Sequence, residues 1–329
     1  MNLLVSIAVV AATAVVAPPS VTDGSGPLDA ARSATEDLSF QGSVEVQWRE
    51  GSEVRREQLT VEDTSGSLFV RGGASVLAIP GQERLVQHGA QWDLLWPAGL
   101  ESRPRPSSEA KYQTTPAGQS TVAGRLTDVL EVRQQEVVRE RVYLDAENGL
   151  LLRRDQFDGT GNTDRKVEFK ALTIGAPARA AEAPSKAVDE TPRRVSTAGS
   201  LRNASAPSEL ADGYHRLGAY RQTGVLHLVY SDGLYDLSLF EQPGTLARGD
   251  LPGGGSAVKI RSAGGRLYAW PGGHAVIWQA GANVLTMVSD APVDQLLRAA
   301  GSVKGRSPSP SVLTRLRQAA RALVAPFSD

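Results

Sequence analysis

The feature that most constrains the fold of this chain is a repeated alternation of apolar and polar residues in short runs. In the run at 42–48, Val44, Val46 and Trp48 fall on one face of an extended chain, and polar residues fall on the other. Such alternation predicts a strand with one buried face. Because many similar runs follow, separated by turn-forming residues, the sequence predicts a mainly β protein.

The first block of these runs spans residues 28–175. A short helix is predicted at its start, because the apolar residues at 28–38 have helical spacing. Strands are predicted at 42–48, 57–61, 67–71, 75–79, 84–88, 92–96, 120–123, 128–133, 137–144, 150–157 and 166–174. A polar, Pro-rich stretch at 102–116 separates the runs into two groups, and tight turns are predicted at 147–149 and 158–161. The pattern favours one antiparallel sheet, traversed up and down, that is strongly curved or forms an open barrel.

A second block, residues 209–301, is predicted to be a smaller α+β unit. Its strands are expected at 225–230, 234–240, 257–261, 266–270, 274–279 and 284–289. The short Gly-containing connection at 231–233 predicts a hairpin between the first two of these strands. A helix follows, with Asp290 as its N-cap, Pro292 in its first turn and Gly301 at its end.

Two further segments have the composition of connecting or interacting chain. Residues 176–208 are rich in Ala, Pro and Ser and hold almost no large apolar side chain, which predicts a mobile, partly extended linker. The tail at 302–329 carries five basic residues against one acid, Asp329, together with apolar residues at helical spacing. This pattern fits either a basic amphipathic helix for an anionic lipid surface or acidic partner, or a helix that packs on its own domain.

Residues 1–17 contain an uncharged apolar run that is short for a membrane span. The run has the character of a signal-peptide core, with small residues that allow cleavage after Ala14 or Ala17. A basic segment before the run is missing, so an uncleaved N-terminal anchor and a buried core helix stay as alternatives. The segment favours a chain exported to the periplasm or the cell-envelope side.

The residue inventory argues against catalytic chemistry. The chain has no cysteine, which removes disulfides, thiolate metal sites and cysteine nucleophiles. Neither His227 nor His274 has a serine–acid pattern beside it, so both are expected to be structural. Adjacent carboxylates such as Glu62 and Asp63 point to opposite faces of a strand and are expected at the solvated surface. The sequence therefore predicts no enzyme, no cofactor and no metal site, and its net charge of −1 argues against a nucleic-acid binder.

Large apolar side chains of the first block suggest a binding face. The predicted strands at 42–48 and 92–96 each place three of them on one side. On the concave side of a curved sheet they could line a lipid-sized pocket. Alternatively, they form the core beneath the helix at 28–38. The candidate ligand-pocket residues are Val44, Val46, Trp48, Trp92, Leu94 and Trp96.

Several motifs resemble those of the MucB/RseB family. In the first block they are the opening segment at 38–42, the VAGR segment at 122–125, and the segments at 128–132, 141–145 (RVYLD), 149–153 (GLLLR) and 169–175. In the second block they are the segments at 210–213 (LADG), 227–233 (HLVYSDG) and 237–240 (LSLF). The two sets occur in the family's order with a linker between them, so the resemblance extends over about 28–303.

The resemblance implies an extracytoplasmic regulator rather than an enzyme. Members of this family have a large domain folded like the LolA-type lipoprotein carriers, which is an unclosed antiparallel β-barrel with a helix plug, and a smaller α+β C-terminal domain. They are negative regulators of an envelope-stress sigma factor. They bind the outer segment of a membrane-spanning anti-sigma factor and shield it from proteolysis, and an amphiphilic ligand is thought to release them.

Other functions remain open at this point. The same barrel cavity would suit a periplasmic lipid or lipoprotein carrier that has no regulatory partner. A hydrolase is a third alternative, although the sequence offers no constellation to support one. The partner-contacting residues and the oligomeric state are not specified by the sequence, and an oligomer is compatible with it.

Overall fold

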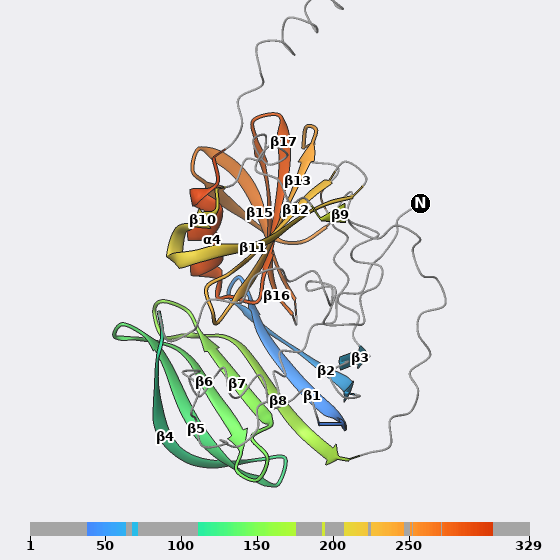
Figure 1. The fold of residues 1–329 in the computed structure, drawn as a ribbon, viewed down its shortest axis with the longest axis vertical. Helices are drawn as coiled ribbons and strands as arrows, with labels where there is room; N and C mark the ends of the chain where they lie inside the picture. Colours follow the sequence, from blue (N-terminus) through green and yellow to red (C-terminus); the bar gives the residue numbers. More distant parts are fainter. Residues whose placement is uncertain are drawn as a thin grey trace, which may run out of the picture.

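The computed structural model describes residues 38–63, 68–71, 111–175, 193–194, 207–222, 225–246, 251, 253–270 and 272–304. These residues form two antiparallel β-sheets and one α-helix, and Figure 1 shows the two sheets one above the other. The first sheet uses residues 40–174 and the second uses residues 193–289. The protein is therefore mainly β, as the alternation predicted. Within the described part of the chain, no helix has both the length and the apolar character needed to cross a membrane.

The first sheet contains eight strands in the order β3-β2-β1-β8-β7-β6-β5-β4. Their bounds are β1 Phe40–Glu50, β2 Glu53–Asp63, β3 Leu68–Arg71, β4 Gln113–Val122, β5 Arg125–Gln134, β6 Val137–Asp145, β7 Leu151–Phe157 and β8 Thr163–Ile174. The up-and-down order holds within β1–β3 and within β4–β8. The sequence did not predict the pairing of β1 with β8, which joins the two halves. The sheet curves strongly, because its edge strand β4 approaches β8 across three intervening strands (Figure 1).

Strand β4 departs from the prediction. It begins at Gln113 and includes Pro116, whereas the sequence predicted a strand only at 120–123. Proline is tolerated at this position because β4 is an edge strand, and because its register with β5 shifts between Pro116 and Gln119. The missing N–H of Pro116 therefore does not interrupt a ladder between two central strands.

Residues with positive φ form the tight turns of the first sheet. Gly149 (φ 73°) and Gly161 (φ 85°) lie in the two turns that the sequence predicted. Ala123 (φ 49°) and Gly124 (φ 75°) connect β4 to β5. Two consecutive positive φ values are what a type I′ hairpin requires. The VAGR segment is thus a hairpin turn, and it places Arg125 at the start of β5.

Several expected elements lie outside the described residues. They are the segment at 1–17, the helix at 28–38, the strands at 75–79, 84–88 and 92–96, and the tail from residue 305 onward. Most of the expected linker at 176–208 also lies outside them. Its described dipeptide Arg193–Arg194 forms strand β9, which pairs with β11 of the second sheet.

The second sheet contains nine strands, eight of them in the order β10-β11-β12-β13-β17-β16-β15-β14, with β9 beside β11. Their bounds are β9 Arg193–Arg194, β10 Glu209–Leu210, β11 Tyr214–Gln222, β12 Val225–Ser231, β13 Asp236–Pro243, β14 Ser256–Ile260, β15 Ala263–Trp270, β16 Gly273–Ala280 and β17 Asn283–Ser289. A single 3-10 turn, η3 at Ala211–Gly213, separates β10 from β11.

The second sheet is larger than the predicted set of six strands. The long strand β11 was not predicted, because its pairing with β12 shifts register between Arg216 and Gly218 and the period of two is broken there. The β12–β13 connection is also longer than the predicted 231–233. It extends to Tyr235, because a carboxylate oxygen of Asp232 accepts hydrogen bonds from the backbone N–H of Leu234 (3.1 Å) and Tyr235 (2.8 Å).

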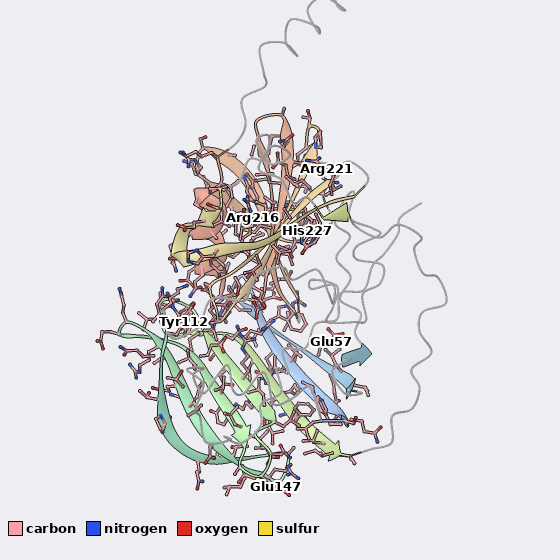
Figure 2. All side chains as sticks on the ribbon, in the orientation of Figure 1. Glu57, Tyr112, Glu147, Arg216, Arg221 and His227 are labelled. Carbon is pink, nitrogen blue, oxygen red and sulfur yellow. The ribbon has the colours of Figure 1, made fainter. Side chains whose placement is uncertain are left out.

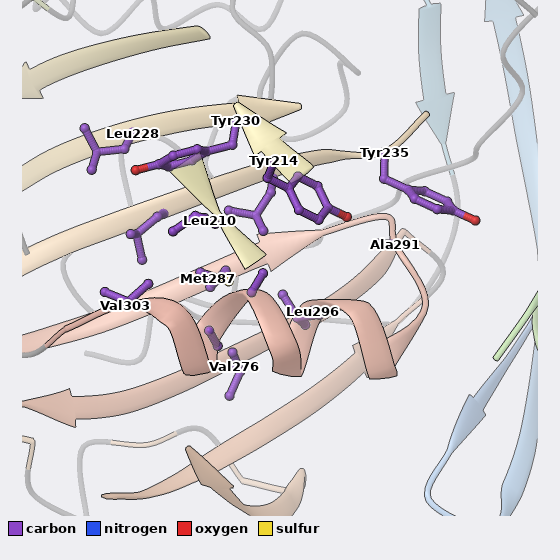
Figure 3. Close-up of a cluster of buried hydrophobic side chains, with 14 of the residues drawn as sticks. Leu210, Tyr214, Leu228, Tyr230, Tyr235, Val276, Met287, Ala291, Leu296 and Val303 are labelled. Atoms are coloured by element: carbon purple, nitrogen blue, oxygen red, sulfur yellow. The ribbon is translucent and has the colours of Figure 1, made fainter. Parts of the chain in front are cut away.

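Helix α4, Val293–Ser302, packs in the hollow of the second sheet (Figure 3). Leu296, Ala299 and Ala300 are fully buried on its inner side. They join the apolar cluster that fills the second unit, whose labelled members in Figure 3 include Leu210, Tyr214, Leu228, Tyr230, Val276 and Met287. The same cluster includes Tyr112, Val132, Val142 and Leu151 of the first unit, so this core extends across the junction of the two units.

The predicted N-cap of α4 is wrong. Pro292 occupies the N-cap position, and no side chain caps the helix from there. The Asp290 carboxylate instead accepts a hydrogen bond from the backbone N–H of Asp236 at 3.1 Å. Its other oxygen lies 3.2 Å from Nη1 of Arg154, a residue of the first sheet. Asp290 therefore belongs to the junction between the two sheets.

Candidate functional site at the junction of the two sheets

One face of the first sheet carries apolar side chains on β1 and charged side chains on β6–β8. A row here means the residues that lie opposite one another on neighbouring strands. Residues directly opposite each other in antiparallel pairs share a face of the sheet. The first row across this face contains Trp48, Arg165, Gln156 and Glu140, and the neighbouring row contains Val46, Val167, Arg154 and Val142. On β1 the face is apolar, and on β6–β8 it carries buried charges that meet the second sheet.

Glu140 and Arg154 form the centre of this charged region. Nε of Arg154 is 2.9 Å from both carboxylate oxygens of Glu140, and the two side chains are 1% and 5% exposed. Nη1 of the same guanidinium reaches Asp290 at 3.2 Å. The amide of Gln156 donates to Glu140 (3.0 Å) and to the backbone carbonyl of Asp290 (3.0 Å). A bidentate ion pair within one sheet is thus extended into the other sheet.

The two buried guanidinium groups of this region have opposite pKa shifts. Burial alone would lower the pKa of Arg154, but the carboxylates of Glu140 and Asp290 raise it above its ordinary value. Burial, reinforced by the neighbouring Arg154 cation, lowers the pKa of Arg165 to about 10. Arg165 donates from Nε to the side-chain oxygen of Gln156 at 2.6 Å. Both arginines remain cations at neutral pH.

The N-terminal end of α4 is held by residues of the first sheet. The Asp164 carboxylate accepts a hydrogen bond from the backbone N–H of Val293 at 3.3 Å, so an acid from another sheet satisfies a free N–H of this helix. The same oxygen lies 3.6 Å from Nε2 of His274. Nδ1 of His274 donates to the carbonyl of Ala291 at 3.2 Å. One carboxylate therefore joins β8, β16 and α4.

A second contact between the sheets involves Lys111, Tyr112 and Asp232. The Tyr112 hydroxyl donates to Asp232 at 2.7 Å, and the Lys111 ammonium is hydrogen-bonded to the same oxygen. Lys111 also lies 5.3 Å from the ring centroid of Tyr214. Burial, together with the charge of Asp232, raises the pKa of the Tyr112 hydroxyl well above its ordinary value. Figure 2 shows Tyr112 at the edge of the first sheet that faces the second unit.

The predicted pocket residues divide into two groups. Val44, Val46 and Trp48 are 0%, 0% and 7% exposed and lie in one apolar cluster with Phe40 and Phe169. Ala269 of the second sheet packs against the same cluster. No described residue accepts a hydrogen bond from the indole N–H of Trp48. The other three candidates, Trp92, Leu94 and Trp96, lie outside the described residues.

The opposite face of the first sheet carries charges that neutralise one another. Glu131 binds Arg133 at 2.8 Å and Arg141 at 2.5 Å, and Asp155 binds Arg153 at 2.6 Å. Hydrogen bonds from Arg141 and then Arg133 lower the pKa of the Glu131 carboxyl. This face therefore presents paired charges rather than a field of one sign.

Two of the motifs that resemble the MucB/RseB family are bound to each other. Arg125 of the VAGR segment is hydrogen-bonded through Nε to Asp145, the last residue of the RVYLD segment. It also reaches Glu147 at 2.6 Å. Figure 2 places Glu147 at the end of the sheet remote from the second unit. This pair fixes the β4–β5 turn against the β6–β7 turn, far from the junction.

The described residues contain no group of three or more His, Cys, Asp or Glu side chains that could hold a metal ion. His227 is 4% exposed, stacks on Phe240 with ring centroids 4.3 Å apart, and contacts the hydroxyl of Ser238 at 3.0 Å. His274 is also buried and serves the junction. Both histidines are buried and contact other residues of the fold, which is what a structural role requires.

Sequence analysis did not identify the charged residues of the junction. Glu140 is two residues before Val142 and four before Leu144 on β6, so all three point to the same side of the strand. The alternation expects apolar residues on that side. Arg154 pairs directly with Val142 and shares that side. A charged residue at a strand position where the alternation expects an apolar one could have indicated a buried charge. It would not have indicated which residue pairs with that charge.

A family model for the MucB/RseB N-terminal domain matches residues 32–187. The structure of the Pseudomonas aeruginosa MucA/MucB complex is similar at 19% identity, with 84% of this chain and 96% of that chain covered and a TM-score of 0.46. The structure of MucB in complex with MucA(peri) is similar at 20% identity, with 84% of this chain and 96% of that chain covered and a TM-score of 0.44. The structure of MucB alone is similar at 21% identity, with 83% of this chain and 94% of that chain covered and a TM-score of 0.44.

No curated protein sequence matches the chain. The match to the family model includes the VAGR, RVYLD and GLLLR segments and the whole of the first sheet. Residues 32–187 are therefore similar in sequence to the MucB/RseB N-terminal domain.

Proposed function

We propose that this protein is an extracytoplasmic negative regulator of an envelope-stress sigma factor. It would bind the outer segment of a membrane-spanning anti-sigma factor and shield that segment from proteolysis. The match of residues 32–187 to the MucB/RseB N-terminal domain is the observation that carries the proposal. Regulation of this kind depends on occupying a partner's surface and needs no catalytic group. The apolar segment at 1–17 supports export of the chain.

The junction supports this proposal because its contacts hold the two units in one arrangement. Arg154 and Asp290 join β7 to the start of α4, and Tyr112 joins the start of β4 to Asp232. A segment that lies across both units would meet groups in fixed relative positions, which reduces the entropy lost on binding. The anti-sigma segment is therefore assigned to the second unit and its junction with the first sheet.

The proposal extends to the fold and ligand of the first unit. The approach of β4 to β8 supports an unclosed barrel, with the helix at 28–38 as its plug. The buried face of β1 would admit an amphiphile that displaces the partner, because ligand pockets are mostly apolar with a few polar groups. Its proposed lining is Val44, Val46, Trp48, Trp92, Leu94 and Trp96.

The direct test is capture of the partner from the protein's own cells. The tagged full chain is cross-linked in intact cells and purified, and co-purified proteins are identified by mass spectrometry. We expect a single-span membrane protein encoded beside a sigma factor. Deleting the gene should raise transcription from that sigma factor's promoters. Recovery of no anti-sigma-type membrane protein, with unchanged transcription, would overturn the proposal.

A lipid or lipoprotein carrier is the second candidate, and the apolar face of β1 favours it. Chain purified without detergent would then contain bound lipid, detected by native mass spectrometry and solvent extraction. Trp48→Gln and Trp96→Asp should lower the lipid content, and Gln47→Glu, on the opposite face of β1, should leave it unchanged. A carrier would bind lipid but recover no anti-sigma protein in the capture experiment.

A further inference from the structure

The C-terminal quarter of the chain has an unusual charge distribution. Residues 251–289, which include β14–β17, contain no Asp or Glu. The next two acids are Asp290 and Asp294, and both are used at the junction. Asp290 binds Arg154, and Asp294 binds Arg139 at 3.0 Å. Arg139 and Arg154 of the first sheet neutralise these two acids, and Arg298 of α4 also pairs with Asp294 and with Asp212. No ion pair between described residues involves the remaining basic residues of the region, which are Lys259, Arg261, Arg266 and Lys304.

The uncompensated basic residues gather around the β14–β15 hairpin. Lys259 and Arg261 are exposed, and Arg266 is half-buried. The pairs Lys259 with Gly264 and Ala257 with Arg266 place Lys259 and Arg266 on the same face of the hairpin. Val258 and Ile260 lie on the other face of the hairpin and pack into the core of the second unit. The basic side chains therefore occupy the solvent side of an edge hairpin.

The tip of this hairpin lies beside the C-terminal end of α4. Nη1 of Arg261 donates to the carbonyl of Gly301 at 3.3 Å, one of the last carbonyls of the helix. Lys304 is exposed and follows three residues later. Arg261 has φ 55°, a left-handed backbone conformation that is strained for a residue other than glycine.

The orientation of α4 determines where this patch faces. The N-terminal end of the helix is at the junction, where Val293 meets Asp164. A helix of 10 residues extends for about 15 Å, so its C-terminal end and the hairpin tip lie away from the first sheet. A surface bound there would leave the junction and the apolar face of β1 uncovered.

We infer that Lys259, Arg261, Arg266 and Lys304 form a docking surface for the anionic headgroups of a phospholipid bilayer. The sequence beyond Lys304 continues the pattern, since residues 305–328 contain four arginines and no acid. Apolar residues with helical spacing, such as Leu313, Leu316 and Leu323, accompany these arginines. Basic charge combined with apolar residues favours a lipid surface over a soluble acidic protein, which would need the charges alone. This inference does not depend on the identity of the anti-sigma partner.

The test is sedimentation of the full chain with vesicles of phosphatidylglycerol and phosphatidylcholine, or of phosphatidylcholine alone, at low ionic strength. We expect binding to the anionic vesicles only, weakened by added salt. The variant K259Q/R261Q/R266Q should bind about 100-fold more weakly, since each basic residue near an anionic surface contributes about fivefold. The control R55Q/R56Q/K170Q removes three exposed charges from the first sheet and should bind like the wild type.

Several results would overturn the inference. They are failure of the wild type to bind anionic vesicles, equal weakening in the two triple variants, and preferential binding to soluble polyglutamate. Circular dichroism shows whether the hairpin variant is folded. A chain shortened after Lys304 supplies a second measurement if that variant does not fold. The shortened chain should retain salt-sensitive binding through the hairpin, and complete loss of binding would contradict a role for Lys259, Arg261 and Arg266.

Discussion

Arg154 lies on β7 of the first sheet and Asp290 directly follows β17 of the second, yet a guanidinium nitrogen of Arg154 is 3.2 Å from a carboxylate oxygen of Asp290. Arg154 on β7 also binds Glu140 on the neighbouring strand β6. One buried cation therefore forms an ion pair within the first sheet and another with the second unit. The packing of the two units is therefore coupled to the internal structure of the first sheet.

Glu140→Gln should destabilise the protein by about 3 kcal/mol, because it leaves the buried Arg154 cation without its main counter-charge. The measurement is the free energy of unfolding from urea denaturation. Glu136→Gln is the matched control, since Glu136 is an exposed acid at the β5–β6 turn and its replacement should change stability little. Equal stability of the two variants would show that the ion pair contributes nothing.

Lys111 and Asp232 should be energetically coupled across the junction. A double-mutant cycle with Lys111→Met and Asp232→Asn is expected to give a coupling of about 1.5–3 kcal/mol, since a hydrogen bond between charged groups is broken in each single variant. Hydrogen exchange at the backbone of Leu234 and Tyr235 should also accelerate in Asp232→Asn if the amide accepts these bonds less well. A coupling near zero would contradict the contact.

His227 should make stability depend on pH. Burial lowers its pKa to about 3 in the folded protein, against 6.5 for the ordinary imidazole. Between these values the unfolded chain binds a proton that the folded chain does not, so stability falls as pH decreases from 6.5 towards 3. The slope contributed by this residue is about 1.4 kcal/mol per pH unit.

The His227 prediction is checked by urea unfolding across this pH range. His227→Gln should abolish the slope that this residue contributes, while the wild type retains it. His215→Gln is the control, because the His215 side chain is 53% exposed. If the wild type and His227→Gln lose stability in parallel as pH falls, the buried imidazole is not the cause.

Gly273→Ala should destabilise the second unit by about 2 kcal/mol or more. Gly273 has φ 139°, and an added Cβ would lie 2.2 Å from the carbonyl oxygen of Ser289 on the paired strand. Gly264→Ala is the comparison, because the Cβ there meets no atom within 4 Å. Thermal unfolding of both variants measures the difference. A Gly273→Ala protein as stable as the Gly264→Ala protein would refute the close approach.

The sequence predicted local structure where one periodicity persisted. The alternation at Val44, Val46 and Trp48 predicted β1 and its buried face, and the glycines at 149 and 161 predicted two turns. The prediction failed where the period was broken, at the Arg216–Gly218 register shift of β11 and at Pro116 of β4. In both places pairing with a neighbouring strand, rather than local preference, maintains the extended chain.

The sequence by itself determined that this chain is mainly β, that it has two blocks of strands, and that the first block resembles the MucB/RseB family. Those properties follow from the period of side chains along a strand and from short motifs, which are local in the chain. Only the tertiary structure decided the junction. The sequence predicted Asp290 only as a helix cap and predicted no role for Glu140, Arg154 or Asp164. These four side chains become partners only when β6, β7, β8 and the segment before α4 meet. An ion pair depends on the distance between atoms that are far apart in sequence, and no local pattern encodes that distance.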